Sequence, residues 1–376
     1  MKDRDTYLIE AVAKALDVLE MFQTREEIRL TDVVRQLGLV KSTAFRLLYT
    51  LERKGYIEHT PGGRGFRRRQ RFRIGMLSIS ATIPFVSEVE ASIQAESARA
   101  GLELLIRHHE FSAQRALAAV DELLGAGISM LVGYNPDEYV AHAIADRCAN
   151  AQVPVIAITF PMPGARLFGI NNFRAGLAGG EGLSEEIIRR WNGDLDWAVL
   201  LDIPGNSPAQ QARMRGMLDG LRRNVIVPDS RVIHLHTDRS RLSPRDLIRD
   251  CLAEHPHPGR IAVMCYNDLN ALGALAAVEA AGRPADVLIL SQGGVADVRE
   301  QIRRPGCPLW GAVAHFPERF GGKLIPLAMR VLRGEPAPQT TYTDHALLTG
   351  ATLGRYYRRE DRSAVRLDPQ PVHPAL

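Results

Sequence analysis

Hydrophobic residues near the start of the chain recur at helical spacing. The segment "YLIEAVAKALDVLEMF" has apolar residues three or four positions apart, which predicts a helix with one buried face. These residues are Leu8, Val12, Ala15, Leu16, Leu19 and Phe22. The next segment, "LTDVVRQLGL", predicts a shorter helix that has Thr31 as its N-cap and ends at Gly38.

A third helix is predicted shortly after this glycine, over "KSTAFRLLYTLERKGYI", with Phe45, Leu48 and Leu51 on its inward face. Two short helices joined by a glycine-containing turn are typical of a helix-turn-helix, whose second helix enters the major groove of DNA. Short hydroxyl and basic side chains on that helix can reach phosphates and base edges. The residues predicted to contact DNA are Lys41, Ser42, Thr43, Arg46 and Tyr49. A helical bundle without a DNA role is the alternative.

A turn and an arginine cluster come after the third helix. The segment "GYIEHTPGGRGF" predicts a β-hairpin wing, because Gly62 and Gly63 can adopt the positive φ of a tight turn. We interpret residues 64–71 as wing and linker contacts to phosphates, which add affinity rather than sequence choice. The arginines predicted to make them are Arg64, Arg67, Arg68 and Arg69. A merely solvated basic face is the alternative.

The rest of the chain alternates strand-like and helix-like segments. Nine apolar runs predict strands, and amphipathic stretches between most of them predict helices, for example over 112–125, 138–151 and 267–281. The alternation predicts a parallel sheet covered by helices, and its length predicts two α/β lobes. The predicted strands are 72–80, 102–108, 128–133, 153–159, 196–203, 231–236, 260–266, 286–291 and 309–315.

The charge of the chain is unevenly distributed. The net charge is +4, but residues 1–75 hold 16 Lys and Arg against 10 Asp and Glu, whereas the remainder holds 31 against 33. A basic first segment on a near-neutral body indicates a domain that binds a polyanion, and DNA is the usual one. The first residues, "MKDRDTYLIE", are charged where a secretion signal would be apolar, and no apolar run approaches the roughly 20 residues of a membrane span.

Neither the cysteines nor the known catalytic motifs indicate an enzyme. The four cysteines are far apart and form no CxxC pair, which argues against a zinc ribbon or disulfide scaffold and fits a reducing cytoplasm. No GxGxxG follows the first strand, "GGEGLSEE" lacks the lysine of a phosphate-binding loop, and no GxSxG occurs. The pairs "HLH" and "HPH" have no evident third metal ligand. We therefore expect no cofactor, metal site or catalysis.

The first 67 residues resemble a known family. The segments "AVAKALDVLEMF", "VKSTAFRLLYTLERKGYIE" and "PGGRGFR" are similar to the winged helix of IclR-type bacterial regulators, over about Tyr7 to Arg67. The resemblance implies an all-α winged helix domain in which the helix around Lys41 to Tyr49 recognises DNA. After Arg67 the chain departs from that family, because the usual effector domain of IclR-type regulators does not come next.

The body resembles the type I periplasmic sugar-binding fold, as used in LacI-type repressors. The segments that carry the resemblance include "IGMLSISATIPFVSEVEASIQAESARAGLELLI", "FGINNFRAGLAGGEGL", "MCYNDLNALGALAAVEAAG" and "AHFPERFGGKLIPLAMRVLRGE". It implies an α/β domain of two lobes over about Phe72 to Gly350, with a ligand between them at the carboxyl ends of the strands.

The resemblance also implies ligand contacts. Phe85 would stack on the ligand, Arg213 would hydrogen-bond a ligand oxygen, and His315 would touch it from the hinge. Asn267 would supply a donor and an acceptor, with Asp268 capping the following helix. For Phe85, packing in the core is the alternative.

Two departures from the sugar-binding pattern affect the ligand. Where many sugar binders place an acidic residue after a strand, this chain has "FPMP" from Phe160, and where they often place Asp it has Gln292 followed by two glycines. Gln292 is included among the predicted ligand contacts. Because carboxylates are the strongest acceptors for hydroxyl donors, a carboxylated or less hydroxylated metabolite is an alternative to a neutral sugar.

Together these features predict a cytoplasmic, ligand-responsive transcription regulator that acts as a homodimer on double-stranded operator DNA. The predicted parts are a winged helix over 1–63, an arginine-rich linker over 64–71, a two-lobed sensor over 72–350 and a tail over 351–376. The alternatives are a solute-binding protein for a sugar transporter and a regulator that senses a small carboxylate. The sequence leaves open whether the ligand releases or recruits DNA.

Overall fold

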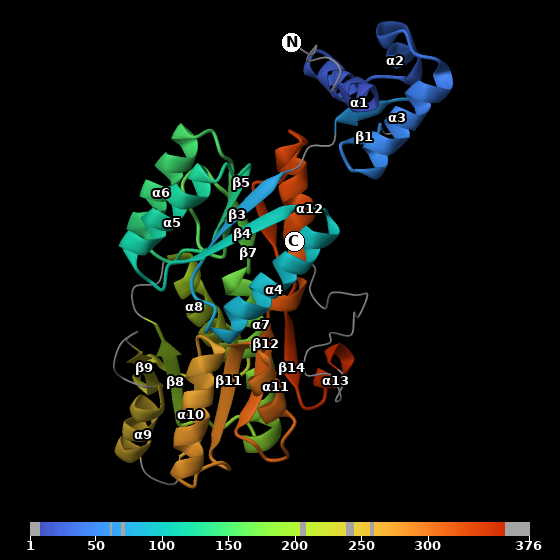
Figure 1. The fold of residues 1–376 in the computed structure, drawn as a ribbon. Helices are drawn as coiled ribbons and strands as arrows, with labels where there is room; N and C mark the ends of the chain where they lie inside the picture. The colour runs from blue at the N-terminus through green and yellow to red at the C-terminus, as the bar shows by residue number, and fades with distance from the viewer. Residues whose placement is uncertain are drawn as a thin grey trace. The chain divides into compact units, whose positions relative to one another are not determined.

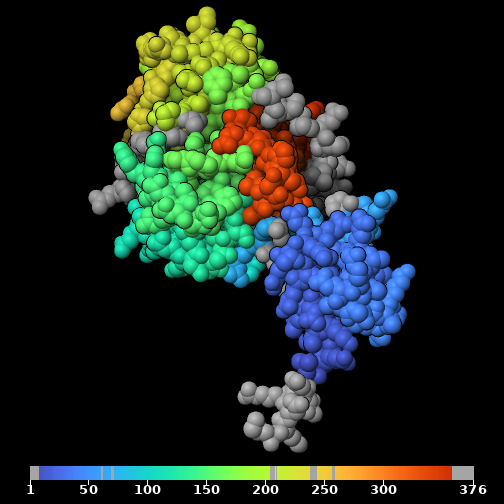
Figure 2. All heavy atoms as spheres, turned by 90° about the horizontal axis from the view of Figure 1, so that it is seen from above, coloured from blue at the N-terminus to red at the C-terminus, as the bar shows by residue number. Residues whose placement is uncertain are grey.

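The structure is a computed structural model that describes residues 8–60, 62–68, 72–203, 208–237, 244–255 and 259–357. The chain divides into two compact units, Met1–Phe72 and Arg73–Leu376. Figures 1 and 2 colour the chain by residue number, so that the first unit is blue.

The first unit is a winged helix, as predicted. Its helices are α1 (Glu10–Glu20), α2 (Leu30–Leu37) and α3 (Lys41–Arg53), with a short 3-10 turn after α1 (Met21–Gln23). Strands β1 (Ile57–His59) and β2 (Phe66–Arg68) pair antiparallel and form the wing. The core buries Val18, Ile28, Val33, Leu48 and Ile57 among others. Gly38 ends α2 with φ +62°, which confirms the predicted turn.

Two details of α2 and α3 differ from the prediction. Helix α2 begins at Leu30, and its cap is made by Asp32, whose carboxylate accepts from the backbone N–H of Arg29 at 2.8 Å; Thr31 is therefore not the N-cap. Phe45 is 56% exposed, because α3 packs through Ala44, Leu48 and Leu51 instead.

The predicted buried face of α1 was also wrong in part. The side chains of Leu8, Val12 and Leu16 are more than half exposed, whereas Val18 is buried. Apolar residues lie on both sides of this helix, so helical spacing alone did not show which side faces the core.

The second unit consists of two lobes, each with a six-stranded sheet (Figure 1). In the first lobe the strand order is β13-β7-β6-β5-β3-β4, and all pairs are parallel. Helices α5 and α6 cover one face of this sheet, and α4 and α12 pack together on the other. The elements are β3 (Arg73–Ser78), α4 (Pro84–Arg99), β4 (Glu103–His108), α5 (Ala113–Gly125), β5 (Met130–Gly133), α6 (Glu138–Asn150), β6 (Val155–Ile158), β7 (Arg166–Gly169), α12 (Phe320–Leu332) and β13 (Thr340–Tyr342).

The second lobe has the strand order β14-β12-β11-β10-β8-β9, in which only β14 is antiparallel to its neighbour. Helices α9, α10 and α11 pack on one face of the sheet, and α7 and α8 pack on the other. The elements are α7 (Asn172–Trp191), β8 (Trp197–Asp202), α8 (Pro208–Arg222), β9 (Val232–His236), α9 (Pro244–Glu254), β10 (Ile261–Cys265), α10 (Asp268–Ala280), β11 (Val287–Gly293), α11 (Ala296–Ile302), β12 (Leu309–Ala314), β14 (Ala346–Thr349) and α13 (Leu353–Tyr356), with short 3-10 turns at Asp229–Arg231 and Pro317–Arg319.

The chain passes between the lobes three times. The crossings follow β7, β12 and β13, and the first lies within the predicted "FGINNF" segment. The backbone N–H of Thr343 donates to the carbonyl of Gly169 at 2.7 Å, so the first and third crossings lie side by side. The lobes are therefore joined by short segments, two of which are hydrogen-bonded to each other, and such a connection allows the lobes to move about a hinge.

Two predicted boundaries need correction. Residues 66–68 pair with 57–59, so the wing extends to Arg68 and the linker cannot begin at 64. Leu353, Tyr356 and Tyr357 lie in the core of the second lobe, so the domain does not end at 350. The nine predicted strands are present, but β7, β13 and β14 were missed. Strand β13 has only three residues, and the apolar runs in β7 and β14 are only two or three residues long, too short for a clear pattern.

Candidate functional site

A cavity of about 460 Å³ lies in the second unit, lined by residues of both lobes. The lining follows the carboxyl ends of the strands, for example Tyr134 after β5, Phe160 after β6, Tyr266 after β10 and His315 after β12. This is where ligands bind in parallel α/β sheets. All five residues predicted to contact a ligand line this one cavity: Phe85, Arg213, Asn267, Gln292 and His315.

Arg213 on α8 is the buried cation of the site. Its side chain is 5% exposed; Nε donates to Oδ1 of Asn172 at 2.9 Å, and Nη1 donates to the backbone carbonyl of Tyr266 at 2.8 Å. The guanidinium also lies over the Tyr266 ring, 4.6 Å from its centre. No carboxylate of the described residues forms an ion pair with it. These contacts fix the plane of the guanidinium and leave donors of the other amino group for a ligand.

Close packing of two helices places Arg213. Gly176 and Gly180 of α7 face Gly216 and Gly220 of α8, and a Cβ atom at any of the four would overlap a backbone carbonyl oxygen of the other helix. At Gly176 that oxygen belongs to Arg213 itself. The glycines therefore allow the backbone of α8 to lie directly on α7, beside Asn172 at the start of α7.

Asn267 is the N-cap of α10, a role that had been predicted for Asp268. The Oδ1 atom of Asn267 accepts from the backbone N–H of Asn270 at 2.9 Å, so its amide NH2 group can serve a ligand. Asp268 is buried and instead accepts from the Ser291 hydroxyl at 2.5 Å and the Val295 N–H at 2.9 Å. Burial raises the pKa of Asp268, and these donors oppose the rise.

His315, in the second crossing, and Gln292, near the end of β11, form a buried polar pair. Nε2 of His315 lies 2.9 Å from Oε1 of Gln292, whose own amide nitrogen donates to the Ala175 carbonyl at 3.4 Å. Burial, together with the nearby Arg213 and His345, holds the pKa of His315 well below its usual value. The ring is therefore neutral, and this hydrogen-bond pattern assigns its proton to Nε2, which leaves Nδ1 as an acceptor.

The first lobe contributes an aromatic wall. Phe85 at the start of α4 meets the ring of His315 edge-on, with centroids 6.1 Å apart. Tyr134 and Phe160 lie beside each other at 5.7 Å, and Phe111 is 50% exposed at the cavity. Thr159, a β-branched residue, has φ +63°, a strained conformation that occurs mostly at functional sites. The cavity is thus lined mainly by apolar side chains, with an aromatic wall from the first lobe and a few polar groups, among them Arg213 and Asn267, facing it from the second.

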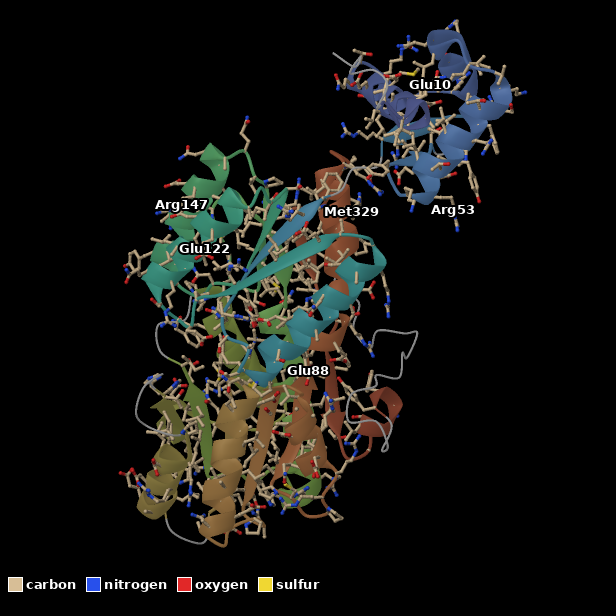
Figure 3. All side chains as sticks on the ribbon, viewed as in Figure 1. Glu10, Arg53, Glu88, Glu122, Arg147 and Met329 are labelled. Atoms are coloured by element: carbon tan, nitrogen blue, oxygen red, sulfur yellow. The ribbon has the colours of Figure 1, made fainter. Side chains whose placement is uncertain are left out.

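A second charged cluster lies at the lobe interface. Glu88, labelled in Figure 3, lies on α4, and Arg299 and Asp268 of the other lobe are close enough for their charges to affect its pKa. Burial raises the pKa of Glu88 to about 7, with smaller raising effects of Glu318 and Asp268 and an opposing effect of Arg299. Glu88 is therefore partly protonated near neutral pH, at a place where the lobes meet.

Several residues of the cavity were not predicted from the sequence. Tyr134 directly follows a predicted strand, so the rule that ligands bind at the carboxyl ends of strands would have found it. At Phe160 the sequence indicates only that the acidic residue of many sugar binders is absent. Gln210, whose amide donates to the Tyr266 hydroxyl at 3.2 Å, had no signal in the sequence.

The first unit exposes most of the residues predicted to bind DNA. Lys41, Ser42, Arg46 and Tyr49 are exposed on α3, and Thr43 is half-buried. On the wing, Arg64 and Arg68 are exposed. Arg69 lies outside the described residues.

Arg67 is a weaker candidate than the other wing arginines. It is half-buried, and its guanidinium pairs with Glu58 of β1 at 2.7 Å. An arginine whose charge is already balanced within the wing contributes less to phosphate binding.

Among the described residues, the requirements of a metal site and of a membrane span are not met. Within those residues, no three His, Cys, Asp or Glu side chains group as metal ligands do, and no helix has both the length and the apolar character needed to cross a bilayer. The four cysteines are buried, and burial raises the thiol pKa of each.

Comparison with known proteins gives two family matches. The model of the periplasmic binding protein domain matches residues 74–336, and that of the IclR helix-turn-helix domain matches residues 11–61. The ribose import binding protein RbsB of Salmonella typhimurium is 26% identical over 254 residues, which cover 67% of this chain and 82% of that protein. The HTH-type transcriptional regulator XynR of Escherichia coli is 36% identical over 70 residues, 18% of this chain and 25% of XynR.

A solved structure has the same fold as the second unit. An ABC transporter solute binding protein from Mycobacterium smegmatis, with bound glycerol, superposes with a TM-score of 0.66 at 20% identity. The match covers 76% of this chain and 97% of that one.

Proposed function

The chain belongs to the periplasmic binding protein domain family and carries an IclR helix-turn-helix domain ahead of it, and from this we propose a ligand-responsive transcription regulator. The first unit binds operator DNA, and the second binds a sugar or sugar-like metabolite between its lobes. A solute-binding protein for a transporter needs no DNA-binding unit, so that alternative is not favoured.

The observation that carries the proposal is the convergence of Phe85, Arg213, Asn267, Gln292 and His315 on one cavity. Its aromatic wall suits the apolar face of a sugar ring, and its polar wall suits the hydroxyl and ring oxygens. Relatives with this fold include a protein named for ribose import. The ligand roles of the five residues are part of this proposal.

The polar wall favours acceptor groups on the ligand. Asp268 is the only acidic residue among the described lining residues, and its carboxylate oxygens already accept hydrogen bonds from the Ser291 hydroxyl and the Val295 N–H. Donors remain on Arg213 and Asn267. We therefore propose that ligand oxygens mainly accept hydrogen bonds here, so a screen must include sugar acids beside neutral sugars.

Assembly, location and domain boundaries also belong to the proposal. The protein acts as a homodimer, since two helix-turn-helix units on a two-fold axis match a palindromic operator. It works in the cytoplasm, where operator DNA is found. It binds its ligand without transforming it. The winged helix ends near Arg68, and the sensor begins near Arg73.

A thermal-unfolding screen of the full chain tests the ligand site. A ligand of the cavity raises the unfolding temperature, because at a hundred times its Kd it stabilises the folded state by about 2.7 kcal/mol. The panel contains pentoses, hexoses, sugar acids and small carboxylates, and each hit is repeated on Asn267→Ala. A shift that the variant loses supports the site. No shift from any sugar or sugar acid, or a shift that Asn267→Ala retains in full, would contradict it.

A further inference from the structure

Two aromatic side chains are exposed on the outer face of α3. Phe45 is 56% exposed and Tyr49 is 52% exposed, one helical turn apart. Their rings are stacked, with centroids 6.3 Å apart and planes inclined by 20°. Helix α3 packs into the core through Ala44, Leu48 and Leu51, so Phe45 is not needed to anchor it.

The surroundings of this aromatic pair are basic and hydroxylic. Lys41 and Arg46 are both exposed and flank the aromatic pair on α3, with Ser42 between them in sequence. Glu52, near the end of the helix, is paired with His59 of the wing at 3.6 Å. Positive charge around an apolar centre fits the major groove of DNA, where phosphates line both edges and base edges form the floor.

The ring of Phe45 has neither a donor nor an acceptor, so it cannot read the hydrogen-bonding edge of a base. The apolar group that an unmodified major groove offers is the C5-methyl group of thymine. We propose that Phe45, with its ring held by Tyr49, packs against a thymine methyl and makes this thymine a required base of each operator half-site. The inference rests on the proposed function, because it assumes that α3 enters the groove.

The experiment isolates the methyl group. DNA that the full chain enriches from a random library defines the half-site, and each thymine in it is then replaced in turn by deoxyuridine, which lacks only the methyl. At one position, wild-type affinity should fall about fourfold, the worth of one buried methyl or methylene group. Phe45→Ala should bind the thymine and deoxyuridine sites equally, whereas Phe45→Leu, which keeps an apolar group, should retain most of the difference.

Controls separate this inference from its premise. Arg46→Ala should lose affinity yet keep the thymine preference, and Tyr139→Ala, an exposed aromatic of the second unit, should change neither. Placing cytosine or 5-methylcytosine at that position tests whether a methyl from another base is also read, and wild type should prefer the methylated base. Absence of any enriched sequence would refute the proposed function itself.

If the chain enriches a DNA sequence but no deoxyuridine replacement lowers the affinity of wild type, only this inference is refuted. If every deoxyuridine replacement weakens wild type and Phe45→Ala equally, Phe45 does not contact thymine. A Phe45→Ala protein that keeps wild-type DNA binding but sediments as a smaller species would show that the aromatic pair instead contacts a second copy of the chain. The large exposure of Phe45 predicts that Phe45→Ala unfolds at the wild-type temperature.

Discussion

Gly176→Ala should weaken ligand binding although the residue is not at the cavity. A Cβ atom at this position would overlap the carbonyl oxygen of Arg213 and come within 3.0 Å of the Met217 nitrogen, against an ordinary contact of about 3.5 Å. Helices α7 and α8 must therefore move apart, and overpacking of this kind costs about 1–3 kcal/mol of unfolding free energy. Because Arg213 moves with its backbone, its charge-assisted hydrogen bond to the ligand weakens. Complete loss of that bond corresponds to roughly 1.5–3 kcal/mol, a decrease in affinity of about tenfold to a hundredfold.

Calorimetry with a ligand found in the screen and denaturant unfolding of the same samples measure both effects. Gly322→Ala is the matched control: it also lies inside a helix, α12, but a Cβ there meets no atom within 4 Å. Alanine at Gly322 should leave the affinity unchanged and stabilise the fold by about 0.4–1 kcal/mol. If Gly176→Ala is as stable as Gly322→Ala and binds the ligand equally well, the close crossing of α7 and α8 does not position Arg213.

Four other substitutions test the site, the lobe interface and the wing. Arg213→Ala should reduce ligand affinity at least tenfold, as measured by calorimetry. It should also destabilise the fold by about 1–3 kcal/mol, as measured by denaturant unfolding, because the Asn172 side-chain oxygen and the Tyr266 backbone carbonyl lose their buried hydrogen-bond donor. Because the pKa of Glu88 in the folded protein is raised to about 7, its contribution to the stability of the fold is present below about pH 4.5 and is lost as the pH rises through about 7. Glu88→Gln should therefore raise the stability above that of wild type by more at pH 8 than at pH 5. An equal gain at both pH values would contradict the raised pKa. Arg68→Ser should lower the slope of log K against log salt by about 0.9 if Arg68 contacts one phosphate, whereas Arg67→Ser should change the slope less because Arg67 pairs with Glu58. Equal slopes for the two variants would contradict this ranking.

The second unit could be predicted well because its signals are strong and repeated. The buried parallel strands are continuous apolar runs, and the segments around Asn267 and His315 follow strands β10 and β12. Since the carboxyl ends of parallel strands share one edge, residues far apart in sequence could be expected to meet there. The cavity confirms that they do.

Other features depend on tertiary contacts that the sequence pattern does not encode. Asp268 and Asn267 are both common N-cap residues. Asp268 does not cap α10 because its carboxylate accepts hydrogen bonds from Ser291 and from the backbone N–H of Val295 at the start of α11, and these positions are set by the tertiary fold. Phe45 has helical spacing from Leu48, but the smaller Ala44 takes the place in the core. The close packing of α7 on α8 was not predicted, because the need for glycine at these positions is visible only once the backbone of the opposite helix is placed against them.

A ligand held between the lobes should change DNA binding by the first unit, and this coupling is central to the proposed function. The most direct test is the Kd of the full chain for its enriched DNA, measured by fluorescence anisotropy with and without a saturating sugar from the screen. Wild type should show a change of about fivefold or more, the lower range of typical coupling between sites, and Asn267→Ala should show a smaller change at the same sugar concentration. A sugar that raises the unfolding temperature while leaving the Kd for DNA unchanged at saturation would contradict the coupling.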